Sequence, residues 1–337
     1  MADRVLVTGI SGFLGGHVAL QLLQAGYLVR GSIRSLDRAD KVRATLARAG
    51  GDISRLEFVA LDLLKDSGWA EAMADVRYLM HTASPFVLET PKDPEELIRP
   101  AVDGTRRAVE AALAARVERV VLTSSIAAIQ YGHDEVSRAF TEADWTVPDS
   151  AKTGAYAASK TLAEREAWRL MDGAGRHKDL AVINPAVILG PLLDEDPGTS
   201  ATMVRRLLDG RLPAMPKLAF GMVDVRDVAA LHVDALTNPA AGGERCVASE
   251  GNYWMKDIGR MLHPAFPDRR IPKLEVPNWL IRLVALFDRD VREVLPEIGV
   301  MKQVDGRRGP ERLGRAMIPT AEAAAATARS LIAQGLV

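Results

Sequence analysis

Three polar side chains are spaced so that they could carry out one reaction. Tyr156 and Lys160 are four residues apart in a segment with a helical pattern, so a phenol and an ammonium share one helix face. Ser125 ends an apolar run, residues 120–125, that predicts a buried strand. An ammonium stabilises a neighbouring phenolate, so the phenol can pass a proton to a carbonyl oxygen that the serine hydroxyl also binds. This set predicts reduction at a carbon that bears oxygen.

A glycine-rich loop at the start of the chain can hold a dinucleotide. Gly9, Gly12 and Gly15 follow a short apolar strand and open an apolar helical segment. Such glycines permit a tight turn, a close approach to the pyrophosphate and tight packing of helix on strand, while the helix N-terminus offers free amides. Tyr-x-x-x-Lys alone is common on exposed helices and would not indicate an active site. Together with a dinucleotide-binding loop, it supports a catalytic role for Tyr156 and Lys160. We expect cofactor contacts from Thr8, Gly9, Ser11, Gly12, Phe13, Leu14 and Gly15.

The residues after the second predicted strand indicate which cofactor binds. An NAD site usually places a carboxylate there, which takes the ribose 2′-hydroxyl. Here Arg34 follows the strand, and Arg38 and Lys41 come soon after. Guanidinium and ammonium groups pair with a 2′-phosphate. We therefore predict NADPH, although Arg38 and Lys41 would also suit the solvated face of a helix.

Further cofactor contacts are expected where the next strands end. Asp62 and Leu63 follow the third strand, where Asp62 could reach the adenine edge or cap the next segment. Small residues follow the fourth strand and would let the cofactor lie close: Thr82, Ala83 and Ser84. His81 belongs to that strand and is expected to be packed or hydrogen-bonded.

The elements that must position these residues alternate along the first half of the chain. Strand patterns occur at residues 5–8, 28–33, 56–61, 78–82, 120–123 and 180–184, with helical patterns at 13–25, 38–49, 67–74, 94–116 and 154–173. This alternation predicts an α/β fold, a Rossmann-type doubly wound parallel sheet. From about residue 191 prolines become frequent and the alternation stops. We expect a nucleotide-binding domain at 1–190, to which 223–243 returns, and a smaller, mainly helical substrate-binding region from 191–222 and 244–337.

Composition narrows the possible partners. The chain has 337 residues and a net charge of -1, which leaves no basic surface for nucleic acid. Its one cysteine, Cys246, excludes an internal disulfide, and the histidines lack metal-ligand spacing, so no metal is expected. With no apolar run long enough to span a bilayer and no room for a signal peptide, we expect a cytoplasmic protein that is a monomer or a homodimer.

Several short segments match the motifs of one enzyme family. Each match is weak by itself, but together they are specific for the family: 7–15, 31–34, 81–86, 100–105, 123–125, Tyr156 with Lys160, 184–191 and 224–229. Together they resemble the extended short-chain dehydrogenases/reductases over nearly the whole chain. The most similar branch holds dihydroflavonol 4-reductase, cinnamoyl-CoA reductase and yeast-type ketone/aldehyde reductases. The resemblance implies catalysis by Ser125, Tyr156 and Lys160. Tyr156 and Lys160 are also expected to contact the cofactor, with Lys160 on the ribose hydroxyls. The resemblance implies further cofactor contacts from Thr123, Pro185, Ala186 and Val187, and a substrate covered by 191–222.

The substrate class follows from departures and from pocket candidates. The residues after Ser125 lack the substrate-contacting asparagine of flavonoid reductases, and the segment before Tyr156 lacks the aromatic motif of cinnamoyl-CoA enzymes. An ordinary aldehyde or ketone fits better. Candidates that line the pocket, each of which could equally be core, are Phe86, Ile126, Gln130, Met203 and Phe220. Most are apolar, which favours a lipophilic carbonyl compound.

Other functions on the same scaffold remain open. A nucleotide-sugar epimerase or dehydratase often needs an added acid/base pair near the serine, yet Ile126, Ala127 and Ala128 follow Ser125. A 3β-hydroxysteroid dehydrogenase-like enzyme would use the same residues. A redox-sensing binding protein would keep the fold without needing an intact Ser-Tyr-Lys set. The chemistry of the site ranks a carbonyl reductase, with a small-molecule carbonyl or alcohol as its substrate, above all three.

Overall fold

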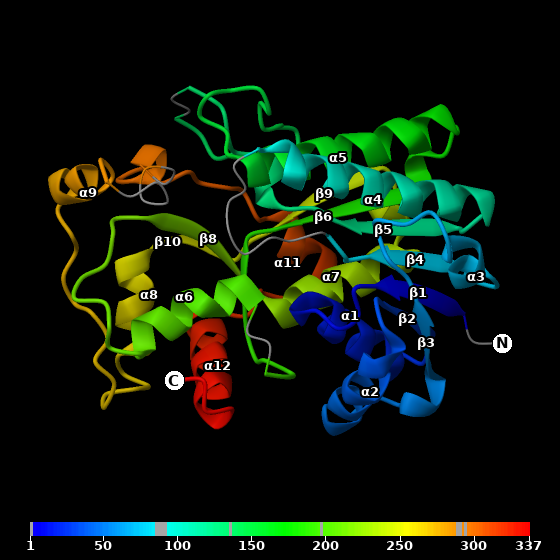
Figure 1. The fold of residues 1–337 in the computed structure, drawn as a ribbon, viewed down its shortest axis with the longest axis horizontal. Coiled ribbons are helices and arrows are strands. Elements are labelled where there is room, and N and C mark those ends of the chain that lie inside the picture. Colours follow the sequence, from blue (N-terminus) through cyan, green and yellow to red (C-terminus); the bar gives the residue numbers. More distant parts are fainter. Residues whose placement is uncertain (1–2, 85–92, 135–136, 196–197, 288–291, 293–294) are drawn as a thin grey trace.

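The computed structural model describes residues 3–84, 93–134, 137–195, 198–287, 292 and 295–337. Seven strands form one parallel sheet in the order β3-β2-β1-β4-β5-β6-β9 (Figure 1). Their bounds are β1 Arg4–Thr8, β2 Leu28–Ile33, β3 Leu56–Ala60, β4 Tyr78–His81, β5 Arg119–Thr123, β6 Leu180–Pro185 and β9 Glu244–Ala248. The predicted α/β class with a parallel sheet is confirmed.

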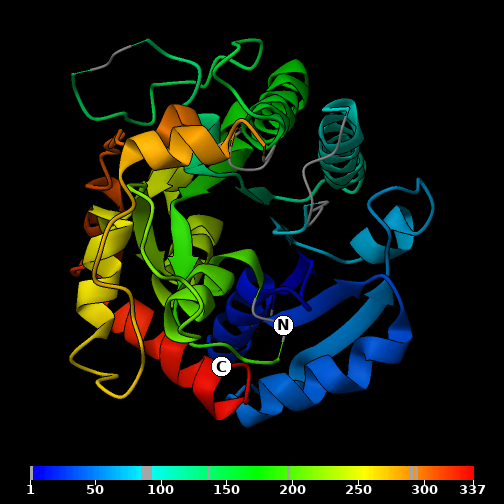
Figure 2. The same ribbon diagram turned by 60° about the vertical axis from the view of Figure 1, so that its left-hand side comes forward.

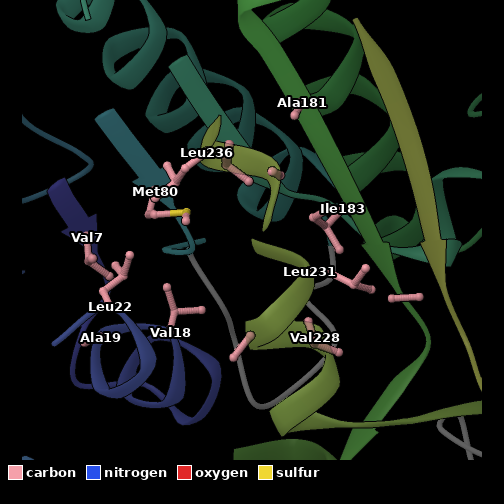
Figure 3. Close-up of a cluster of buried hydrophobic side chains, with 14 of the residues drawn as sticks. Val7, Val18, Ala19, Leu22, Met80, Ala181, Ile183, Val228, Leu231 and Leu236 are labelled. Atoms are coloured by element: carbon pink, nitrogen blue, oxygen red, sulfur yellow. The ribbon is translucent and has the colours of Figure 1, made fainter. Parts of the chain in front are cut away.

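Helices cover both faces of this sheet, because successive residues of a strand point to opposite sides. In β1, Val5 and Val7 face a core shared with α1 and α7, in which Val7 lies close to Leu22 (Figure 3). Leu6 faces a second core, built on α3, α4 and α5. The helices are α1 Phe13–Gln24, α2 Ala39–Arg48, α3 Trp69–Met73, α4 Glu95–Ala114, α5 Ala155–Gly173 and α7 Val225–Thr237. Such burial on both sides explains the unbroken apolar runs at residues 5–7 of β1 and 120–122 of β5.

The strand order reverses between β1 and β4. Successive strands extend the sheet from β1 through β2 to β3 in one direction, and from β4 through β5 to β6 in the other. In open parallel sheets the loops at the carboxyl ends of the strands separate at such a point and leave a crevice for ligands. The glycine loop after β1 and the segments after β4 and β5 therefore meet at one edge.

A second region has its own small sheet, in the order β10-β8-β7, and its own apolar core. Helices α12 and α8 pack together in it (Figures 1 and 2). Its elements are β7 Val187–Leu189, α6 Gly198–Leu208, β8 Ala219–Asp224, β10 Gly251–Trp254, α8 Met255–Leu262, α9 Asn278–Val284 and α12 Thr320–Ala333. Helix α11, Arg308–Leu313, comes late in the chain but packs on α7 and β9 of the main sheet. Its core joins residues as distant in sequence as Leu189 and Leu331.

Three strands differ from the expected division of the chain. The strand β7 was expected within the nucleotide-binding domain, yet it pairs with β8 in the small sheet. The strand β9 lies within the segment expected in the second region, yet it pairs with β6 as the seventh strand of the main sheet. Conversely, β8 pairs with β7 and β10, and only the helix after it, α7, returns to pack on α1. Short apolar strands carry no local mark of the sheet they join, because strand partners are chosen by tertiary packing.

No helix of the described part of the chain combines the length and the apolarity that a membrane span requires.

Candidate active site

The glycine loop closes tightly against the end of β4. Gly9 has a φ of +73°, and a Cβ built on it would lie 3.0 Å from the Ala83 Cα. A Cβ on Gly15 would lie 2.1 Å from the Gly9 carbonyl oxygen, so only glycine permits helix α1 to approach the turn this closely. Gly12 caps α1 without a side-chain hydrogen bond, which leaves the first amides of the helix free. Free amides at a helix N-terminus suit a pyrophosphate.

Hydrogen bonds join the ends of β1 and β4. The Thr82 hydroxyl donates to the Thr8 carbonyl oxygen (2.6 Å), and the Ala83 amide donates to the Thr8 hydroxyl (3.2 Å). The same hydroxyl lies 2.9 Å from His81 Nδ1. Burial, aided by the nearby Lys160 ammonium, lowers the pKa of His81 to about 3, so this side chain is neutral at physiological pH. His81 is thus hydrogen-bonded inside the sheet, as predicted.

Two exposed arginines follow β2. The guanidinium groups of Arg34 and Arg38 make neither an ion pair nor a hydrogen bond with any residue that the structure describes. Lys41, also exposed, lies 3.7 Å from Glu195 of the second region. The nearest acid in this loop, Asp37, accepts a hydrogen bond from the Ser35 hydroxyl (2.8 Å). The end of β2 therefore presents free positive charge where an NAD site would present a carboxylate.

The segment after β3 shows one of the two roles considered for Asp62. Its Oδ1 accepts a hydrogen bond from the Leu64 amide at 3.0 Å, which is the capping role. Leu63 packs towards α4, because a Cβ on Gly104 would lie 3.3 Å from the Leu63 Cβ. Contacts of Asp62 and Leu63 with adenine stay a prediction.

Residues from β4, β5 and α5 converge on one small cavity. It is lined by His81, Ala83, Ser84, Thr105, Leu122, Thr123, Ser124, Lys160, Ala163 and Glu164. Lys160 Nζ lies 5.9 Å from the centre of the Tyr156 ring, on the next turn of α5. Tyr156 is 45% exposed, so its phenol is accessible to a ligand. The structure therefore places the Lys160 ammonium at the ends of β4 and β5, with the exposed Tyr156 ring one turn before it on α5; Tyr156 and Ser125 do not line this cavity.

The Ser125 hydroxyl is oriented by the backbone amide of Ala127, two residues later. Ser125 precedes the short 3-10 helix η3, Ile126–Ala128, and its hydroxyl oxygen accepts a hydrogen bond from the Ala127 amide at 3.0 Å. A hydroxyl that accepts one bond keeps its hydrogen for another. Ser125 can therefore donate to the oxygen of a substrate.

The residue at the end of β5 is held by a buried histidine. The Thr123 hydroxyl lies 2.7 Å from His232 Nε2, and His232 Nδ1 lies 2.8 Å from the Val228 carbonyl oxygen. Since a carbonyl only accepts, Nδ1 carries the hydrogen and Nε2 accepts from Thr123. Burial lowers the pKa of His232 to about 4, so it remains neutral in this role.

The residues expected to line the substrate pocket and the nicotinamide site are partly buried in the two cores. Ile126 and Ala186 are both buried, and a Cβ on Gly221 would lie 3.3 Å from the first and 3.2 Å from the second. Met203, Phe220 and Val187 are half-buried against the core of the second region, Pro185 is buried at the end of β6, and Phe86 lies outside the described residues. Gln130 is 8% exposed, and its Oε1 has no hydrogen-bond partner in the described structure.

Sequence reasoning missed a buried ion pair behind Ser125. Glu164 and Arg245 are both buried, with Arg245 Nε 2.6 Å from Glu164 Oε1. A signal for Glu164 exists, because it continues the four-residue spacing of Tyr156 and Lys160 along α5. Arg245, a lone cation in an apolar strand, gave no comparable hint of its partner.

Comparisons with known proteins agree with this architecture. Residues 5–248 match the model of the NAD dependent epimerase/dehydratase family. The chain is 34% identical to cinnamoyl-CoA reductase CAD2 of Medicago truncatula over 81% of this chain and 84% of that protein. It is 33% identical to tetraketide alpha-pyrone reductase 2 of Arabidopsis thaliana, over 79% and 84%. The crystal structure of yeast methylglyoxal/isovaleraldehyde reductase Gre2 complexed with NADPH superposes with a TM-score of 0.80, at 26% identity, over 99% of this chain and 100% of that one.

Proposed function

The chain belongs to the NAD dependent epimerase/dehydratase family, within the extended short-chain dehydrogenases/reductases, and is an NADP-dependent oxidoreductase. From this premise we propose that it reduces an aldehyde or ketone to an alcohol, reversibly, with Tyr156 as the proton donor. The observation that carries this proposal is the placement of Lys160 beside the ends of β4 and β5, with the exposed Tyr156 ring 5.9 Å from its Nζ, at the carboxyl edge where the glycine loop also lies.

The residues present fit NADPH. The Gly9–Gly15 contact leaves no room for side chains and exposes the first amides of α1 to a pyrophosphate, while Arg34 offers an unpaired guanidinium to the 2′-phosphate. When bound, NADPH supplies the hydride that reduces the carbonyl carbon. Lys160, which lines the small cavity at the ends of β4 and β5, would hold the ribose hydroxyls.

The protein's own groups handle the substrate oxygen. The Ser125 hydroxyl, which already accepts from the Ala127 amide, donates a hydrogen bond to this oxygen and orients the carbonyl. Tyr156 then passes its phenolic proton to the same oxygen as negative charge develops on it. His81 takes no part in this transfer, because burial keeps it neutral and its Nδ1 is bonded to Thr8.

Epimerase or dehydratase chemistry is less well supported. Ile126, Ala127 and Ala128 of η3 follow Ser125, are buried, and cannot act as an acid or a base. Aldehyde or ketone reduction needs no group beyond the serine, tyrosine and lysine, so it is the simpler function for this site.

Turnover with carbonyl compounds tests the proposal directly. We expect the purified protein to oxidise NADPH in the presence of lipophilic aldehydes or ketones, and to oxidise NADH at least about tenfold less efficiently. The measurement is the loss of reduced-cofactor absorbance across a panel of aromatic and aliphatic carbonyls. Tight NADPH binding without turnover of any carbonyl, but with conversion of a nucleotide sugar, would reject the proposal in favour of an epimerase or dehydratase.

The unpaired guanidinium of Arg34, after β2, leads to a separate prediction about cofactor preference. Replacing Arg34 by alanine should raise the Kd for NADPH about tenfold and leave that for NADH nearly unchanged, because one charged contact to the 2′-phosphate contributes about 1.4 kcal/mol. Isothermal titration with both cofactors measures the two constants. Arg48→Ala, which removes an exposed arginine at the far end of α2, is the matched control and should change neither. Equal weakening of both cofactors by Arg34→Ala would contradict a 2′-phosphate contact.

A further inference from the structure

We propose that Glu164 is a positioning residue that sets the Ser125 hydroxyl relative to Tyr156, acting through Ser124 and Asn184. This inference rests on the proposed carbonyl reduction, because it concerns the placement of two groups that bind the same substrate oxygen.

Glu164 is the centre of a buried polar network. Its side chain is fully buried and accepts five hydrogen bonds. Ser124 Oγ (2.5 Å) and Asn184 Nδ2 (2.8 Å) donate to Oε2. Arg245 donates to both carboxylate oxygens, from Nε to Oε1 at 2.6 Å and from Nη2 to Oε2 at 3.3 Å. Trp168 Nε1 donates to Oε1 at 3.3 Å.

This network holds the backbone on both sides of the Ser125 side chain. Ser124, the residue before it, is fixed by its bond to Glu164. Asn184 Nδ2, which also donates to Glu164, reaches the Ser125 carbonyl oxygen at 3.2 Å. A rotation of the Ser125 backbone would therefore break one of these two contacts.

Arg245 extends the same restraint to the segment that follows Ser125. Its Nη2 lies 3.4 Å from the Ala128 carbonyl oxygen at the end of η3, and its Nη1 donates to the carbonyl oxygens of Glu142 (2.8 Å) and Asp144 (2.6 Å). The guanidinium also stacks 3.8 Å from the centre of the Trp145 ring. The cation that neutralises Glu164 thus anchors the turn that carries the Ser125 hydroxyl.

The carboxylate and the proton donor share one rigid element. Tyr156, Lys160 and Glu164 recur every four residues along α5 and so lie along one side of the helix. Tyr156, at the start of α5, would bind the substrate oxygen. Glu164, about two turns later, accepts hydrogen bonds from Ser124 and Asn184, which hold the Ser125 segment. The helix that carries Tyr156 therefore also holds the Ser125 segment in place.

Stability alone does not account for this arrangement. Removing two charges from water is unfavourable, and buried ion pairs can often be replaced by apolar residues of similar volume without loss of stability. A buried pair that lies behind the Ser125 segment, and that binds Ser124, Asn184 and the Ala128 carbonyl oxygen, suits positioning. Catalysis is sensitive to such placement, because a misplacement of about 1 Å can lower a rate by about 10²-fold.

A double-mutant cycle between Glu164 and Ser125 tests the proposal. Ser125→Ala should lower kcat by about 10² to 10³ through loss of the oxygen-binding hydroxyl. Glu164→Gln should lower kcat by at least about tenfold in the otherwise unchanged protein, yet by less than about twofold in the Ser125→Ala background, because residues that act through one group are not additive. The Kd for NADPH, measured by titration, should stay within about twofold in every variant, since the glycine loop is not touched.

A second variant covers the case in which Glu164→Gln does not fold. Ser124→Ala removes a single donor to the carboxylate and leaves the ion pair intact. It should lower kcat at least about threefold in the unchanged background and have no further effect beside Ser125→Ala. Equal rate losses in both backgrounds, or an unchanged kcat in a folded variant, would overturn the proposal.

Controls separate positioning from mere loss of stability. Asp227 is an equally buried carboxylate, paired with Arg315 at 2.6 Å on α7, outside the reacting centre. Asp227→Asn should lower the thermal midpoint while leaving kcat unchanged. If the unmodified protein reduces carbonyls and Tyr156→Phe stops it, yet the cycle is additive, the positioning role fails and the function stands. If the unmodified protein reduces no carbonyl, the function itself fails.

Discussion

Tyr156→Phe should reduce kcat for carbonyl reduction by about 10² to 10⁴, the usual contribution of a positioned general acid. The substitution removes only the phenolic hydroxyl, and the ring remains on α5 in reach of Lys160. Because the side chain is 45% exposed, the loss of the hydroxyl should change the free energy of unfolding by less than about 0.5 kcal/mol. The Kd for NADPH should therefore stay within about twofold, so that only the chemical step is affected.

Steady-state rates and a cofactor titration on the same preparation measure both quantities. Tyr27→Phe is a matched control, since Tyr27 directly precedes β2 at the amino edge of the sheet, away from the reacting centre. That variant should keep its full turnover. Substantial turnover by Tyr156→Phe would mean that another group, or water, protonates the substrate oxygen, and the mechanism proposed for Tyr156 would have to be abandoned.

Gly15→Ala should nearly abolish cofactor binding. The new methyl group would lie 2.1 Å from the Gly9 carbonyl oxygen and 2.8 Å from its carbon, and neither backbone atom can move without opening the loop. We expect the Kd for NADPH to rise at least about 100-fold, a loss of about 2.7 kcal/mol. The displaced helix should also lower the free energy of unfolding by about 1–3 kcal/mol, as overpacking does.

The neighbouring glycine provides the control. A methyl group on Gly16 would lie 3.4 Å from Leu193 Cδ1 and 3.7 Å from the Ile10 carbonyl oxygen, which are ordinary contacts. Gly16→Ala should keep NADPH binding and stabilise α1 by up to about 1 kcal/mol, because alanine is the better helix former. Fluorescence titration and thermal unfolding distinguish the two variants. If Gly15→Ala bound NADPH as tightly as Gly16→Ala, the close approach of helix and turn would not be what forms the phosphate site.

Much of the fold could be predicted from local sequence patterns. The apolar runs that predicted strands at 5–8 and 120–123 correspond to β1 and β5, and the helical pattern at 154–173 corresponds to α5. These patterns are reliable because a strand buried on both faces must be apolar throughout and a helix must repeat every 3.6 residues. The glycine spacing was equally informative, since the tight contact of Gly15 with Gly9 excludes any larger residue.

The candidate active site could be predicted from the sequence less completely than the fold. Tyr156 and Lys160 share a helix, so their proximity followed from spacing alone, and their catalytic roles stay predictions. The carboxylate two turns further along α5 could have been noticed by the same spacing. Its partners could not, because Ser124, Asn184 and Arg245 come from three different strands or their ends and are brought together only by the order of the sheet.

Local patterns were enough to place the strands and helices of about the first 190 residues and the glycine loop, and to propose which side chains react, because each of these depends on residues within about one helix or one turn of each other. Only the tertiary structure decided which sheet β8 and β9 join, that His232 holds Thr123, and that Glu164 and Arg245 lie behind Ser125. The physical reason is that strand partners and buried polar contacts are selected by packing between segments far apart in the chain. Arg245 meets Glu164 across 81 residues, a separation over which no local pattern carries information.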